Sequence, residues 1–212
     1  MKRIIKTFFS IIIIIIFLVS LGGCGSDPKV LDININEDLV VDFEIVEVPE
    51  EMHERYTPYV VINEEATVEE LEETAKAVAK QVAENKEFRA LSISFHDLEE
   101  YTDEYGLPTL GNVRYQPADG WGDALDLEPG DYEELEFSPQ IPEKNWDYQP
   151  SEKEAEIFVT WNYIDFEFYE QHEGDMQRVY EITANELDLS VEEVINAVEK
   201  VDVWYNMGRE NL

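Results

Sequence analysis

The chain has 212 residues, of which 49 are acidic and 15 are basic, and the formal charge is −34 at pH 7. This excess of negative charge excludes a protein that binds nucleic acid through its phosphates, and it disfavours a segment lying flat on anionic lipid. A single cysteine rules out an intramolecular disulfide and a thiolate metal cluster. Aromatic residues make up 12% of the chain and apolar residues recur periodically, so we expect folded structure rather than disorder.

The first residues have the three parts of a bacterial secretion signal. Basic residues precede an apolar run over residues 8–21, which is shorter than the roughly 20 residues that a simple membrane-spanning helix requires. The run ends in Leu21-Gly22-Gly23-Cys24, which resembles the lipobox of bacterial lipoproteins. This resemblance implies that residues 1–23 are removed as a signal peptide and that Cys24 becomes the lipid-modified N-terminus. The alternative is an ordinary secreted protein with a cysteine near its cleavage site.

A lipidated Cys24 would hold the protein permanently at a membrane, because two acyl chains anchor stably at about 0.8 kcal/mol per buried CH₂ group. Residues 24–29 form a short tether, so we expect the folded part at the outer face of the cytoplasmic membrane. Loss of the three basic residues of the signal lowers the formal charge from −34 to −37. We interpret this charge as a solvated acidic surface suited to salty or alkaline surroundings rather than as an acidic binding patch.

Two stretches near the start of the mature chain alternate apolar and polar residues, which is the pattern of half-buried strands. Leu31, Ile33 and Ile35 form the first stretch, and residues 41–45 form the second. Only a few polar residues separate the two stretches. The sequence therefore predicts a β-hairpin here.

Residues 58–97 predict a β-α-β unit. Residues 59–62 form a short apolar strand pattern, and residues 91–95 alternate as a second strand. Between them, Thr67 and Glu70 have the spacing of a capping box, and apolar residues then recur at helical spacing as far as a helix end near residue 86. A helix that joins two strands in this way favours a right-handed crossover onto one sheet.

Glycine and proline interrupt residues 97–152, where we expect irregular structure with short strands at 112–116 and 132–137. Two features of this stretch could bind a ligand. The first is a group of acidic residues beside glycines, which offers the oxygen ligands that Ca²⁺ prefers, although the spacing matches no EF-hand and aspartate is common in turns. Its members are Asp119, Asp123, Asp126, Glu128 and Asp131.

The second feature is aromatic. Trp121, Trp146 and Tyr148 lie in the same irregular stretch and could form an exposed platform for a sugar or a peptide. Residues of this kind also fill the core beneath long loops. The sequence leaves both roles open.

The last third of the chain has helical periodicity. Apolar residues recur at helical spacing after Ser151, after Gly174 and after Ser190, and Ser190 begins a second capping box. The sequence therefore predicts one α+β domain over residues 30–207. In this domain a small sheet containing a β-α-β unit is followed by a C-terminal three-helix segment, and residues 208–212 form a tail.

Residues 182–201 also resemble a helix-turn-helix pattern. A helix that reads DNA needs basic residues to enter the groove, whereas the second helix here carries Glu192, Glu193 and Glu199 beside one lysine. We therefore interpret the corner as structural and expect no nucleic-acid partner.

No motif for catalysis, metal or cofactor is present. The three histidines, His53, His96 and His172, are widely spaced and match no ligand pattern, so we expect them to be ordinary structural or surface residues. The serine elbow, the phosphate-binding loop and the H-E-x-x-H motif do not occur. We therefore predict no cofactor, no metal and no catalytic residues.

A wider resemblance covers about two thirds of the mature chain. The strand and helix of the β-α-β unit are similar to small uncharacterised lipoprotein domains of Gram-positive bacteria, and this similarity implies a shared fold and a surface location but no catalytic residues. The segments that carry it are Tyr59–Ile62, the helix from Thr67, Leu91–Asp97, Thr109–Val113, Gly120–Ala124 and Pro129–Tyr132.

The favoured hypothesis from the sequence is a membrane-anchored, non-enzymatic envelope protein that binds a partner protein or a glycan. The alternative is a carboxylate-based enzyme acting on cell-wall glycan, since two acids can flank a glycosidic bond. A substrate-capturing lipoprotein of a transporter is disfavoured, because the chain is short for two lobes.

Overall fold

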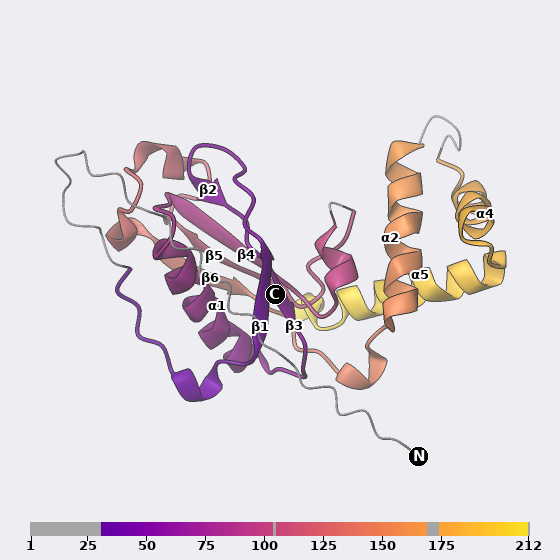
Figure 1. The fold of residues 1–212 in the computed structure, drawn as a ribbon, viewed down its shortest axis with the longest axis horizontal. Helices are drawn as coiled ribbons and strands as arrows, with labels where there is room; N and C mark the ends of the chain where they lie inside the picture. Colours follow the sequence, from indigo (N-terminus) through magenta and orange to yellow (C-terminus); the bar gives the residue numbers. More distant parts are fainter. Residues whose placement is uncertain (1–30, 104, 169–173, 212) are drawn as a thin grey trace, which may run out of the picture.

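The computed structural model of the protein describes residues 31–103, 105–168 and 174–211. The predicted signal peptide, Cys24 and its tether lie outside these residues, and so does His172. Within the described part the fold is α+β, as predicted: a mixed sheet with one helix along it, followed by three helices (Figure 1).

The described residues form a six-stranded sheet. The two-residue β2 pairs with the start of β4, and both β2 and β3 run parallel to β4, while the other neighbours are antiparallel. The predicted β-α-β unit is therefore confirmed, with α1 as its helix. The order across the sheet is β1-β3-β4-β5-β6, and the elements are β1 (Phe43–Glu47), β2 (Arg55–Tyr56), β3 (Tyr59–Ile62), α1 (Val68–Ala83), β4 (Ala90–His96), β5 (Gly111–Gln116) and β6 (Glu136–Gln140).

α1 begins at the predicted capping box and covers one face of the sheet. Thr67 Oγ1 accepts from the Glu70 backbone N–H at 3.3 Å, and the Glu70 carboxylate accepts from the Thr67 N–H at 2.8 Å. These bonds satisfy two donors that the first helical turn leaves free. The buried stripe of α1, which includes Leu71 and Val78, packs in one hydrophobic cluster with Leu91, Ile93 and other strand residues.

The predicted first strand is wrong. Leu31 is buried and Ile33 half-buried against the sheet core, but the structure has no strand at residues 31–35. The segment that follows runs beside α1: the Asn36 N–H donates to the Glu73 carboxylate, 2.8 Å away, and the Val41 N–H donates to the Thr74 hydroxyl, 3.2 Å away. The alternation at residues 31–35 therefore reflects the burial of one side of the segment and not strand pairing.

The predicted hairpin is also wrong. The second stretch, residues 41–45, pairs with another strand and not with the first stretch. β1 lies antiparallel to β3, with Phe43 opposite Ile62. The predicted strand at 132–137 is displaced: Tyr132–Glu134 form a 3₁₀ helix, and β6 begins at Glu136.

The three-helix segment is confirmed and has a hydrophobic cluster of its own. α2 (Glu152–Glu167) and α5 (Val191–Asn206) begin at the predicted Ser151 and Ser190, each with a complete capping box, and α4 (Met176–Leu187) lies between them in the chain. In Figure 1 the helices stand to one side of the sheet. Phe158 of α2 and Val201 of α5 belong to the second cluster, which we call the helical cluster.

The end of α5 returns to the sheet core. Trp204 is fully buried there, with its ring centroid 5.5 Å from that of Trp146. The Lys144 amine donates to the backbone carbonyls of Trp204, Tyr205 and Met207 at 2.5, 3.1 and 3.2 Å. These are carbonyls that the end of a helix leaves without partners. One amine thus joins the end of α5 to the segment that follows β6.

Among the described residues, no helix combines the length and the apolar character that crossing a bilayer requires.

Candidate functional site

A cleft of about 760 Å³ opens between the sheet and α2. Glu47 ends β1, Pro49 follows it, and Tyr59 begins β3. Residues 99–103 and α2 supply the rest of the lining. The volume falls in the range of roughly 300–1,000 Å³ that small-molecule sites occupy. We call this hollow the acidic cleft.

The lining of the acidic cleft is rich in carboxylates and hydroxyls and contains no lysine, arginine or histidine among the described residues. Low-dielectric walls of one charge sign focus the electrostatic field inside a cleft and attract ions of the opposite sign. The cleft can therefore hold amines or other cationic groups. Its carboxylates are Glu47, Glu99, Glu100, Asp103 and Glu156, and its hydroxyls are those of Tyr59, Thr102 and Thr160.

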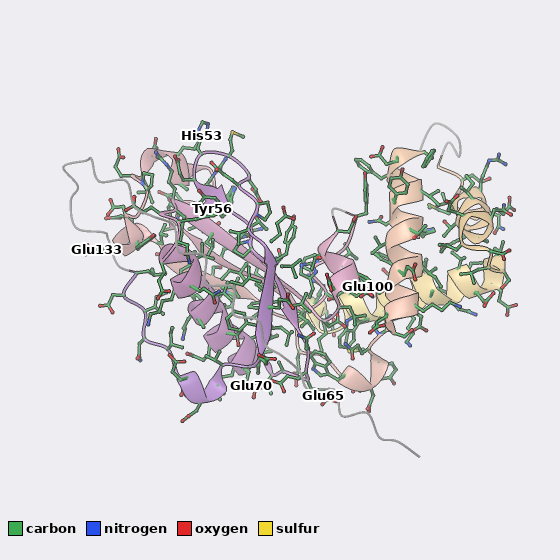
Figure 2. The ribbon with its side chains drawn as sticks, in the orientation of Figure 1. His53, Tyr56, Glu65, Glu70, Glu100 and Glu133 are labelled. Atoms are coloured by element: carbon green, nitrogen blue, oxygen red, sulfur yellow. The ribbon has the colours of Figure 1, made fainter. Side chains whose placement is uncertain are left out.

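Buried neighbours fix the walls of the acidic cleft. The 3₁₀ helix Glu99–Thr102 is held by Tyr101, which is fully buried and lies edge-to-face with Phe158, 6.4 Å between centroids. On α2, Ile157 and Phe158 face the helical cluster, so Glu156 remains on the exposed side. Figure 2 shows Glu100 beside α2.

A second, smaller hollow of about 180 Å³ adjoins the cleft and includes Asp97. Burial raises the pKa of Asp97, and hydrogen bonds from Thr109 and Gln149 partly offset this effect. The Thr109 hydroxyl lies 2.5 Å from one carboxylate oxygen, and Gln149 Nε2 lies 3.1 Å from the other. Asp97 therefore fastens the loop after β4 to the segment before α2.

His96 is buried at the end of β4, in agreement with a structural role. Its Nδ1 lies 3.0 Å from the Leu107 carbonyl oxygen, and the Tyr59 ring packs edge-on at 5.8 Å. Its Nε2 has no partner among the described residues. Burial lowers the pKa of His96 to about 4, so the ring is neutral at pH 7.

The acidic loop at 119–131 is organised by arginine. Arg89 donates to the carbonyl oxygens of Leu125, at 2.9 Å, and Leu127, and it forms an ion pair with Glu54 at 3.1 Å. Across the described part of the chain, no three His, Cys, Asp or Glu side chains are grouped so that they could hold a metal ion. The carbonyl oxygens of Leu125 and Leu127 in this loop are thus already bound by a guanidinium.

The three aromatic residues predicted as a platform do not lie together. The Trp121 ring lies beneath the Arg55 guanidinium, 5.5 Å from the ring centroid, and Arg55 is paired with the start of β4. Trp146 is half-buried near the start of α1, where its Nε1 donates to the Ala66 carbonyl at 3.3 Å. Tyr148 is 55% exposed. The structure brings Trp146 near Tyr148 and leaves Trp121 apart.

The corner between α4 and α5 is a packed helical hairpin. Asp188 ends α4 in the left-handed conformation, with φ 53° and ψ 44°. Val194 and Val198 of α5 face the helical cluster, so this side of the second helix is covered.

The acidic cleft was missed by sequence reasoning. Its members are scattered from residue 47 to residue 160, and with 49 acidic residues in the chain no spacing marks these five. Our interpretation of the charge as an evenly solvated surface did not anticipate that five carboxylates would share one hollow.

Comparisons with known proteins give no match for this chain among protein-family models, curated proteins or solved structures.

Proposed function

We propose that the protein is a lipid-anchored, non-enzymatic binding protein of the extracytoplasmic surface, and that the acidic cleft binds a basic segment of an envelope protein. The observation that supports this proposal is a cleft of about 760 Å³ to which the described residues contribute five carboxylates and no basic side chain. Carboxylates that line one cleft attract a cationic group, and this attraction is screened by salt. Affinity should therefore fall as salt is added.

Neutralising two carboxylates of the cleft, one on each of two elements, should weaken binding of a pentalysine peptide at least tenfold. The variant is Glu100→Gln with Glu156→Gln, which retains side-chain size and removes two negative charges. The matched control is Glu133→Gln with Glu134→Gln, because both residues are exposed and Glu133 lies at the far side of the molecule (Figure 2). Titration calorimetry on the purified lipidated protein measures both. Equal weakening in the two variants would mean that net charge, and not the cleft, attracts the peptide.

A carboxylate-based enzyme is the alternative that the sequence leaves open, and the site favours binding over it. Glycoside hydrolysis needs an acid that holds its proton beside the scissile bond. Burial gives Asp97 a raised pKa, but Asp97 is absent from the cleft lining, and both of its oxygens accept hydrogen bonds within the fold. The acid best suited to donate a proton is therefore occupied in holding the structure together.

The anchor has a test of its own. Cys24→Ala should abolish metabolic labelling with a radioactive fatty acid and release the protein from the membrane fraction, because the proposed acyl chains have no other thiol for attachment. A variant that still carries the label would rule out lipidation at this residue. Cys24→Ala should leave pentalysine binding unchanged, which separates the anchor from the cleft.

A further inference from the structure

The strand β1 has a free backbone edge beside the acidic cleft. It stands at one end of the sheet order and pairs with β3 alone among the described residues. No other described backbone group is hydrogen-bonded to it. In an antiparallel strand that is paired on one side only, alternate residues direct their N–H and carbonyl groups outward. These groups can bond to a further strand.

The two faces of β1 differ in chemistry. Ile45 lies opposite Val60, which belongs to the core that the sheet shares with α1. Glu44 and Glu47 lie opposite the residues of β3 on either side of Val60, so both glutamates are on the other face. The register shift at Val46 lets them share that face although two residues separate them in the sequence. One face of the strand is thus apolar and the other acidic.

A hollow of about 290 Å³ lies on the apolar face, between the end of β1 and the end of α1. We call it the apolar hollow. The one basic group at its rim, the Lys86 amine, lies 3.3 Å from the Val48 carbonyl oxygen and 4.7 Å from the centroid of the Tyr56 ring. The hollow therefore suits an aliphatic side chain and repels a second amine. Its lining is Ile45, Val48, Gln81, Val82, Asn85 and Lys86.

Carboxylates border the same strand on its other face. Glu47 lines the acidic cleft, and Glu44 lines the adjoining hollow of about 180 Å³. Glu99 and Glu100 line both spaces. In Figure 1 α1 lies to one side of β1 and α2 to the other. A strand added to β1 would therefore present its alternate side chains to an apolar hollow and to a group of carboxylates.

We propose that the basic segment bound by the acidic cleft is an extended strand that pairs with the free edge of β1 and alternates basic and apolar residues. This inference rests on the proposed function of the cleft. Backbone hydrogen bonds to β1 supply affinity, and the two kinds of space on its two faces select the alternating sequence. A second copy of this chain fits less well, because its own β1 would bring Glu44 and Glu47 against the same carboxylates.

The first test compares two peptides of identical composition, each with four lysines, three valines and blocked ends. In one peptide lysine and valine alternate, and in the other the lysines precede the valines. Titration calorimetry on the purified lipidated protein should give at least tenfold tighter binding for the alternating peptide. Only that order sends lysine to one face of a strand and valine to the other. Equal affinities would overturn the proposal.

The second test blocks the backbone of the alternating peptide by N-methylation. Lysine and valine N–H groups point to opposite edges of the extended peptide, so methylating three valines or three lysines blocks a single edge. Methylating the central valine and both neighbouring lysines blocks both edges with the same number of methyl groups. At least one single-edge peptide should retain binding, and the two-edge peptide should bind at least tenfold more weakly. Retention by all three, or loss in all three, would contradict pairing through one edge.

The apolar hollow is tested by Val48→Thr, which replaces a methyl group with a hydroxyl. Binding of the alternating peptide should weaken about fivefold, while pentalysine binding should stay unchanged. The matched control is Val203→Thr, the same exchange at a 54% exposed valine of α5, and it should affect neither peptide. If Val48→Thr changed the affinity of both peptides equally, or of neither, the hollow would not be the site of the aliphatic side chain.

Failure of this inference is distinguishable from failure of the proposed function. If the cleft bound no basic segment, pentalysine would not bind, and Glu100→Gln with Glu156→Gln would change nothing. If the cleft bound a basic segment without strand pairing, pentalysine would bind and depend on these two glutamates, while the order and the methylation of the peptide would have no effect.

Discussion

Replacing Trp204 with alanine should lower the free energy of unfolding by about 3–5 kcal/mol, the range for truncating a fully buried aromatic side chain. The ring is 0% exposed, packs against Trp146 in the sheet core, and lies 5.1 Å from the Lys144 amine. Its loss would leave a cavity where the helical segment joins the sheet. Urea denaturation followed by circular dichroism measures the change.

Val203→Ala provides the control for Trp204. Val203 is the preceding residue of α5 and is 54% exposed, so its truncation should change the free energy of unfolding by less than about 0.5 kcal/mol. A loss below about 1.5 kcal/mol for Trp204→Ala would show that the contact between α5 and the sheet core contributes little to stability.

Acidification from pH 6.5 to about pH 4 should destabilise the protein through His96. The pKa of His96 is about 4 in the fold and 6.5 in its ordinary state, so between these values the unfolded chain binds more protons than the folded one. Stability therefore falls as the pH falls through this window. The difference between the two pKa values corresponds to a loss of about 3 kcal/mol when the window has been crossed.

His96→Asn isolates this effect. The asparagine amide can still donate to the Leu107 carbonyl but has no ring to titrate. The raised pKa of Asp97 acts in the opposite direction, because the folded state then holds its proton more tightly, and both proteins share this contribution. The free energy of unfolding, measured in urea at each pH, should fall more steeply in the unmodified protein than in the variant. Parallel pH profiles would contradict the assignment.

Elements with local signals were predictable from the sequence. Thr67, Ser151 and Ser190 each precede a glutamate at capping-box spacing, and each begins a helix in the structure. The strand Tyr59–Ile62 was predicted to its exact ends, because it is a continuous apolar run between proline and polar residues. Helix caps and short apolar strands depend on neighbouring residues, so the sequence alone was enough to predict where these elements begin.

Elements that depend on distant partners were not predictable. Residues 31–35 have the periodicity of a strand, but their neighbour is α1, and only the position of Glu73 and Thr74 decides where the backbone of the following segment bonds. The candidate site was not predictable for the same reason. The acidic cleft joins β1, β3, the 3₁₀ helix Glu99–Thr102 and α2, which lie far apart in the sequence.

The edge strand β6 bears on how copies of the protein behave when they are crowded together. β6 is an edge strand, and Pro139 stands in it opposite Val113. Proline has no backbone N–H, so at this position β6 cannot donate to a strand from another molecule. If the protein is anchored as we propose, copies that diffuse in the plane of a membrane meet often, and such an edge resists the strand-to-strand association from which aggregates grow.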